Sequence, residues 1–105
     1  MAQRIFSVLI VDDESLERVL LRNGYEWSKH GFRIIGEADS ARQALDFLER
    51  NEADFVLTDI NMPQVDGLAF VEAAMKRFPE YTTQFIIVTG YRDFEYARQA
   101  VKLGV

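Results

Sequence analysis

The chain has 105 residues, the length of a single domain, and its 49% hydrophobic and 28% charged residues are an ordinary globular profile. A net charge of −5 at pH 7 argues against direct binding of nucleic acid or of an anionic membrane by this segment. The absence of cysteine excludes disulfides and thiolate metal sites, and no apolar stretch approaches the ~20 residues that span a bilayer. Since the start also lacks a signal-peptide pattern, a cytoplasmic protein is expected.

Short apolar segments alternate with helical patterns four times along the chain. The predicted strands cover residues 5–11, 32–38, 54–58 and 84–89. The predicted helices cover residues 15–29, 41–51, 68–78 and 94–103. Strands that alternate with helices of this length indicate right-handed β-α-β crossovers. They predict an α/β fold with a mainly parallel sheet, covered by helices on both faces.

Local signals mark the helix ends and the faces that turn inward. Ser40 and Gln43 form a capping-box pattern before the second helix. Asp66 is a candidate cap for the third helix, and Pro79 ends that helix. Apolar residues at helical spacing predict the buried faces, which are Leu16, Leu20 and Trp27 in the first helix, Ala41, Ala44, Leu45 and Leu48 in the second, and Leu68, Val71, Met75 and Phe78 in the third.

Two of the predicted strands run into acidic residues. Apolar residues 8–11 are followed by Asp12 and Asp13, and apolar residues 55–58 are followed by Asp59. A carboxylate is costly inside a buried strand, so these acids mark strand ends. If the two strands are parallel neighbours, their carboxyl ends lie at one edge of the sheet and the three acids converge. Three acids in one cleft repel one another unless a cation joins them, which predicts a site for a hard divalent metal.

These strand ends and the loops that follow them resemble the receiver domain of two-component response regulators. The resemblance runs from Ser7 to Val105 and rests on several spaced motifs, Asp12-Asp13, Asp59, Asn61-Met62-Pro63, Asp66-Gly67 and Thr89-Gly90. It implies a doubly wound, flavodoxin-like parallel sheet with the strand order 2-1-3-4. It also implies a signalling domain rather than an enzyme.

The resemblance assigns a role to each residue of the site. Asp59 would be the phosphoacceptor, which takes a phosphoryl group from a histidine of a sensor kinase or from a small phosphodonor. Asp13 would bind Mg²⁺ directly and Asp12 often through water. The carboxylate of Asp59 and the backbone carbonyl of Asn61 would complete the metal site. The ion is required because phosphate and carboxylate repel each other. Thr89 would be the switch hydroxyl that bonds a phosphoryl oxygen afterwards.

The receiver pattern continues beyond the last residue of this chain. Receivers carry a fifth strand with a lysine and an aromatic switch residue, followed by a fifth helix, and these positions fall after Val105. Lys102 comes too early to supply the lysine. We therefore expect residues 1–105 to be a C-terminally truncated receiver domain that can bind Mg²⁺ but is phosphorylated slowly or is poorly coupled to a conformational change. The open edge of the fourth strand predicts self-association.

The leading function is that of a phosphorelay receiver which regulates an effector. Residues 89–97 resemble receivers attached to AraC-type helix-turn-helix domains, which predicts transcription control through a DNA-binding domain absent from this chain. No membrane partner is expected. One alternative is a receiver-like interaction module that does not respond to phosphate. Another is a Mg²⁺-dependent phosphohydrolase with an aspartyl-phosphate intermediate. Such enzymes commonly use an acid two residues after the nucleophile, and Asn61 cannot serve as that acid.

Overall fold

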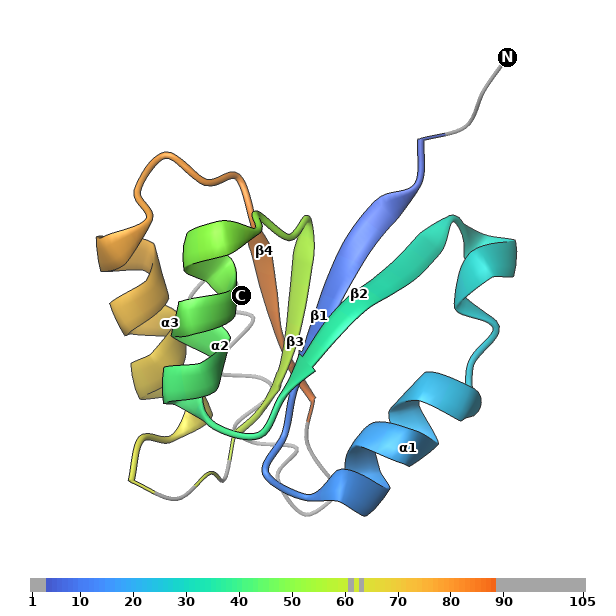
Figure 1. Cartoon of the computed structure of the whole chain (residues 1–105), viewed down its shortest axis with the longest axis horizontal. Helices are drawn as coiled ribbons and strands as arrows, with labels where there is room; N and C mark the ends of the chain where they lie inside the picture. Colours follow the sequence, from blue (N-terminus) through green and yellow to red (C-terminus); the bar gives the residue numbers. More distant parts are fainter. Residues whose placement is uncertain (1–3, 61, 63, 89–105) are drawn as a thin grey trace.

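A computed structural model describes residues 4–60, 62 and 64–88 of the chain, and within them a four-stranded sheet carries three α-helices and one short 3-10 helix. The elements in chain order are β1 (Phe6–Val11), α1 (Ser15–Asn23), η1 (Trp27–His30), β2 (Phe32–Ala38), α2 (Ala41–Arg50), β3 (Phe55–Asp59), α3 (Gly67–Arg77) and β4 (Gln84–Val88). The strand order is β2-β1-β3-β4, and every neighbouring pair is parallel (Figure 1). The predicted α/β class and the predicted strand order 2-1-3-4 are confirmed.

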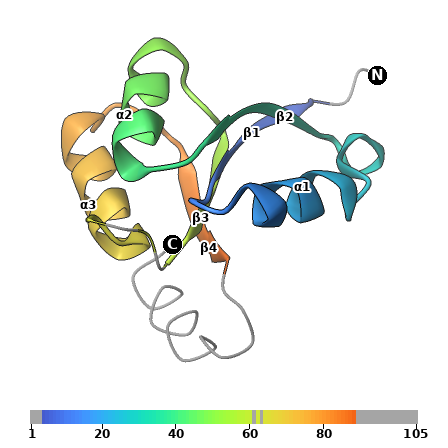
Figure 2. The ribbon, with the colours of Figure 1, turned by 60° about the horizontal axis from the view of Figure 1, so that its bottom comes forward.

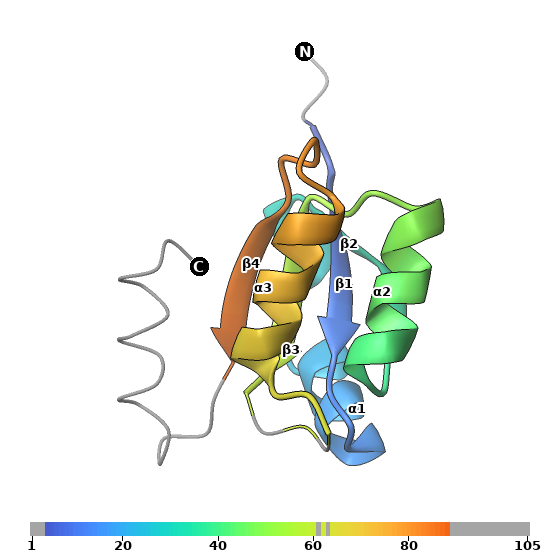
Figure 3. The same cartoon turned by 90° about the vertical axis from the view of Figure 1, so that its left-hand side faces the viewer.

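The helices divide between the two faces of the sheet. Helices α2 and α3 lie side by side on one face, and α1 lies on the other (Figure 2 and Figure 3). Alternate residues of β1 therefore enter two different cores, because successive side chains of a strand point to opposite faces. Leu9 and Val11 belong to the larger core beneath α2 and α3. Val8 and Ile10 belong to a smaller core, against which Leu21 of α1 packs.

Side-chain caps fix where α2 and α3 begin, as predicted. The Ser40 hydroxyl oxygen accepts a hydrogen bond from the Gln43 N–H at 3.1 Å. The Asp66 carboxylate accepts one from the Ala69 N–H at 2.8 Å. Each cap satisfies an N–H group that has no partner inside the first helical turn. The Gln43 side chain accepts a hydrogen bond from the Asp39 N–H, one residue before the position that a standard capping box uses.

The first helix is shorter than predicted. The pattern predicts one helix over residues 15–29, but α1 ends just before Gly24, whose N–H donates to the Leu20 carbonyl at 2.8 Å. The predicted inward stripe is also wrong, because Leu16 and Leu20 are 66% and 58% exposed, whereas Trp27 packs against the smaller core from η1. The helical period that relates Leu20 to Trp27 is interrupted at the glycine, which is a poor helix former.

The buried face of α3 agrees with the predicted one in part, because Val71 is buried and Leu68 and Phe78 pack against the larger core. Gly67, Phe70, Val71 and Ala74 are buried, whereas Met75, predicted to face inward, is 46% exposed. The observed set and the predicted set both have helical spacing, so periodicity alone does not choose between them. Of the helices in the described ranges, none is both long enough and apolar enough to span a bilayer.

Strand β3 runs one residue further than predicted and carries Asp59 at its end. Strand β4 pairs with β3 alone among the described strands and forms one edge of the sheet. Thr89, Asn61 and the predicted helix over residues 94–103 lie outside the described residues.

Asp54 links the start of β1 to the start of β3, at the end of the sheet opposite the acidic strand ends. Its carboxylate accepts hydrogen bonds from the N–H and the hydroxyl of Ser7, at 2.8 and 3.2 Å, and its own N–H donates to the Ser7 hydroxyl oxygen at 2.9 Å. Arg4 adds an ion pair at 2.9 Å. The backbone hydrogen bond from Ser7 is the main reason that the pKa of Asp54 lies below its ordinary value.

Asp54→Asn is expected to lower the free energy of unfolding by about 1–2 kcal/mol at pH 7, because hydrogen bonds to a charged acceptor are lost. A lowered pKa stabilises the fold above the ordinary carboxylate range, so the difference between the two proteins should shrink below about pH 4. Urea unfolding at pH 7 and near pH 3 measures this. Asp46→Asn, which changes an exposed acid on α2, controls for net charge. A difference that is equal at both pH values would contradict the assignment.

Candidate functional site

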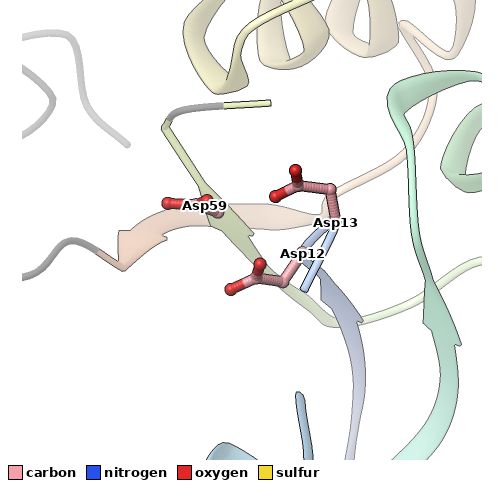
Figure 4. Close-up of side chains that lie close together, drawn as sticks. All are labelled: Asp12, Asp13 and Asp59. Atoms are coloured by element: carbon pink, nitrogen blue, oxygen red, sulfur yellow. The ribbon is translucent and has the colours of Figure 1, made fainter. Parts of the chain in front are cut away.

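The carboxyl ends of β1 and β3 bring three acids together. The two strands are parallel neighbours, and Val11 pairs with Thr58 in the last shared register position. Asp12 and Asp13 follow β1, and Asp59 ends β3, so their side chains lie at the same edge of the sheet (Figure 4). One carboxylate oxygen from each acid lies within 4.8 Å of the others. This is the convergence that the acidic strand ends predict.

The three carboxylates differ in burial and in charge. Asp12 is only 6% exposed, Asp59 is half-buried and Asp13 is exposed. Burial raises the pKa of Asp12 to about 6, the hydrogen bond from the Glu14 N–H opposes the rise, and the nearby charges of Asp59 and Asp13 add to it. A negative charge on Asp12 is therefore unfavourable in the metal-free site, and a cation at the cluster would relieve it.

Three hydrogen bonds hold Asp12, one through its N–H, one through its carboxylate and one through its carbonyl oxygen. Its N–H donates to the carbonyl of Ala38 at the end of β2, at 3.0 Å. Its carboxylate accepts a hydrogen bond from the Glu14 N–H at 3.0 Å. Its carbonyl oxygen accepts a hydrogen bond from the guanidinium Nη1 of Arg18 at 2.6 Å. Together these bonds fix both the backbone and the side chain of the most buried acid in the cluster.

Gly67 lets α3 begin directly against the main chain of Asp59. The Gly67 N–H donates to the carbonyl of Ile60 at 2.9 Å. A Cβ atom at Gly67 would lie 2.2 Å from the Asp59 carbonyl oxygen and 2.9 Å from the Ile60 Cα, and both distances are closer than real contacts allow. The absence of a side chain at this position therefore sets how closely α3 supports the end of β3.

Not every residue in the predicted site falls within the described ranges. Asp12, Asp13 and Asp59 are described and lie together, whereas Asn61 and Thr89 lie outside the described residues. The structure adds Arg18, which the sequence reasoning missed. No local pattern marks this residue, because the groups it contacts come from the β1–α1 loop and from β2.

The donor set of the cluster suits a hard cation. Carboxylate oxygens are the ligands that Mg²⁺ and Ca²⁺ prefer, and three of them here come from two adjacent strand ends. Burial is the main cause of the raised pKa of Asp12, and the charges of Asp59 and Asp13 add to it, so a cation bound here would favour the ionised carboxylate. This acidic cluster could therefore bind Mg²⁺.

The family model described as "Response regulator receiver domain" matches residues 8–105, a range that includes all three acids. The chain belongs to the response regulator receiver domain family. Receiver domains of response regulators are signalling modules, and in this one the acidic cluster lies at the carboxyl edge of the sheet.

Similar proteins carry this receiver domain within longer chains. An "uncharacterized transcriptional regulatory protein YesN" of Bacillus subtilis is 32% identical over 101 residues, which are 96% of this chain and 27% of the relative. A "protein-glutamate methylesterase/protein-glutamine glutaminase 3" of Hahella chejuensis is 43% identical over 82 residues, which are 78% of this chain and 22% of the relative. The receiver therefore spans about a quarter of each of these curated relatives.

A solved structure supports the same fold. The two-component transcriptional regulator AraC from Clostridium phytofermentans superposes with a TM-score of 0.76 at 32% identity, over 95% of this chain and 73% of that chain. The resemblance to response regulators, including AraC-type ones, is thereby confirmed.

Proposed function

We propose that this domain is a phosphorelay receiver, in which Asp59 accepts a phosphoryl group from a histidine of a sensor kinase in a Mg²⁺-dependent reaction. The modified domain then regulates an effector. The observation that carries the proposal is the convergence of Asp12, Asp13 and Asp59 at one edge of the sheet. The match to the receiver family over residues 8–105 supports it.

Position and burial favour Asp59 as the phosphoacceptor among the three acids. Asp12 is nearly enclosed, and its carboxylate already accepts a hydrogen bond from the Glu14 N–H. Asp59 is half-buried and lies on β3, a strand paired on both sides and supported by the close approach of Gly67. A nucleophile held on a rigid element and open to the solvent side is well placed for in-line attack.

The ion would be held by the carboxylates of Asp12, Asp13 and Asp59, and we propose the backbone carbonyl of Asn61 as a further ligand. When bound, Mg²⁺ neutralises the negative charges that would otherwise keep a phosphoryl group away from a carboxylate. An Asp59 oxygen forms the new bond to phosphorus while the bond from phosphorus to the donor nitrogen breaks. The Thr89 hydroxyl is proposed to donate a hydrogen bond to the transferred group afterwards.

The proposed effector is a DNA-binding domain that controls transcription. The names of YesN and of the Clostridium phytofermentans regulator support this choice, and such a role acts in the cytoplasm, where bacterial DNA lies. The methylesterase relative joins the same kind of domain to an enzyme, so a DNA-binding effector requires its own test. We also propose that the outer edge of β4 can pair with a second copy of the chain.

Phosphorylation of the 105-residue chain tests the function directly. In the presence of Mg²⁺ and acetyl phosphate, intact mass spectrometry should detect one phosphoryl adduct on the parent chain and none on Asp59→Asn. Asp46→Asn, an exposed acid on α2, should form the adduct like the parent. Removing Mg²⁺ with a chelator should abolish the adduct.

No adduct on the 105-residue chain or on a version extended beyond Val105, either from acetyl phosphate or from a phosphorylated kinase domain, would contradict the receiver function and favour a phosphate-independent interaction module. Continuous release of inorganic phosphate, without an adduct that accumulates, would instead favour a phosphohydrolase.

A further inference from the structure

Arg18 connects the acidic site to the neighbouring strand. From α1, its Nη1 donates to the carbonyl oxygen of Asp12 at 2.6 Å, and its Nε pairs with the Oε1 of Glu37 at 3.2 Å. The side chain of Arg18 is only 19% exposed. One planar guanidinium group therefore bridges the β1–α1 loop, which carries Asp12 and Asp13, and the end of β2.

Glu37, the partner of Arg18 on β2, is itself held in place by other contacts. Glu37 pairs in register with Ile10 of β1, and its second carboxylate oxygen accepts an ion pair from the Arg22 Nε at 2.7 Å. Among the described residues Arg22 contacts Glu37 and not Asp12, and its side chain is 46% exposed. The two arginines thus share one carboxylate, whereas only Arg18 reaches the acidic loop.

We propose that Arg18 is a positioning residue for the metal site and that it orients the peptide unit between Asp12 and Asp13. This inference rests on the proposed Mg²⁺-dependent function. The N–H and the carboxylate of Asp12 are held by other groups, but its carbonyl oxygen belongs to the peptide unit that leads to Asp13. Fixing that oxygen restricts the rotation that would swing the exposed Asp13 side chain away from Asp12.

Ordering the ligands before an ion arrives strengthens its binding, because less conformational freedom is lost on association. Groups that orient metal ligands without touching the metal typically change affinity by about 10- to 100-fold. The cationic fork of Arg18 acts on a main-chain oxygen, so it orients the ligands without competing with the metal for their carboxylates.

Arg18 also contributes to the attachment of α1, and the experiment must separate the two roles. Within α1, every residue is exposed except Arg18 and Leu21. Loss of the Arg18 side chain will therefore lower the thermal midpoint of unfolding. A purely structural role would leave the Mg²⁺ dissociation constant of the folded protein unchanged, and that constant is the decisive measurement.

The test compares Arg18→Met with Arg22→Met, because both variants remove one positive charge near Glu37 and only the first removes the contact with Asp12. Isothermal titration with MgCl₂ is performed well below the unfolding transition of each variant. We expect Arg18→Met to bind Mg²⁺ about tenfold more weakly and Arg22→Met to stay within about twofold of the parent. Arg18→Lys, which keeps the charge but loses the planar fork, should give an intermediate dissociation constant.

Equal weakening in Arg18→Met and Arg22→Met would overturn the inference, since the contact with Asp12, which Arg18 makes and Arg22 does not, would then not account for the effect. A lower thermal midpoint in Arg18→Met with an unchanged dissociation constant would overturn it as well. If Arg18→Met does not fold, Arg18→Lys is compared with Arg22→Lys, and parental affinity in both variants overturns the inference. A parent chain that binds no Mg²⁺ would refute the proposed function itself, an outcome distinct from the others.

Discussion

Replacing Asp12 by Asn is expected to raise the free energy of unfolding of the metal-free domain by up to about 3 kcal/mol at neutral pH. The physical reason is the pKa of Asp12, which burial raises from 3.8 to about 6, with further contributions from the charges of Asp59 and Asp13. The folded chain therefore opposes ionisation of this side chain. An asparagine keeps the oxygen that accepts the hydrogen bond from the Glu14 N–H, but it carries no charge.

The sign of the pH dependence follows from this raised pKa. Between pH 3.8 and about 6 the folded state of the parent binds more protons at Asp12 than the unfolded state does, so the stability of the parent decreases as the pH rises through this window. Above this pH range, the full free-energy cost of ionising Asp12 in the folded state lowers the stability of the parent. The variant has no proton to lose at this position, so its advantage should be small near pH 3.8 and should level off above pH 6.

Urea unfolding in a chelating buffer across this pH range measures the effect, and Asp46→Asn corrects for the loss of one negative charge. Parallel pH profiles for the parent and Asp12→Asn would contradict the electrostatic origin. Addition of Mg²⁺ should stabilise the parent more than the variant, because an ion that binds only the folded state shifts the equilibrium according to its affinity.

The second large effect is expected at Gly67. Gly67→Ala would place a methyl group 2.2 Å from the Asp59 carbonyl oxygen, and the atoms it would meet belong to the main chain and cannot rotate aside. The start of α3 must then move away from the end of β3. We expect a loss of about 2–3 kcal/mol in the free energy of unfolding, as in other overpacked sites. We also expect weaker Mg²⁺ binding, because Asp59 moves relative to Asp12 and Asp13.

Gly31→Ala is the matched control for this substitution. Gly31 has a φ of 83°, so an alanine there is strained, but the nearest atom to its Cβ is the Arg4 carbonyl oxygen at 3.7 Å. It lies before β2, away from the acidic edge. The control should lose about 1 kcal/mol and keep the Mg²⁺ affinity of the parent. Unchanged affinity in Gly67→Ala would show that the contact supports the fold without orienting Asp59.

The parts of the fold that sequence patterns predict well are those with strong local signals. The strand over residues 32–38 is correct to the residue, and Ser40 and Asp66 cap their helices as expected. The patterns fail where two faces of one helix carry apolar residues at similar spacing, because the spacing then does not show which face is buried. An apolar stripe through Leu16 is as regular as a buried one, yet that residue is largely exposed in the described structure.

The same distinction applies to the site. The three acids are predictable, because each follows an apolar strand and parallel neighbours bring their ends together. The bridge from Arg18 to Glu37 is not predictable, because it depends on how α1 crosses the end of β2. The contact of Gly67 with the main chain of Asp59 likewise requires coordinates, although the glycine itself is visible in the motif.

Few side chains attach α1 to the rest of the domain, and this affects the free energy with which the acids bind an ion. Because only Arg18 and Leu21 of this helix are shielded, we expect local unfolding of α1 to require less free energy than unfolding of the sheet with α2 and α3. Such an opening would withdraw the guanidinium group from the carbonyl of Asp12. Because thermodynamic coupling is reciprocal, an ion bound at the acids would stabilise α1 by the same free energy by which a closed α1 strengthens the binding of that ion.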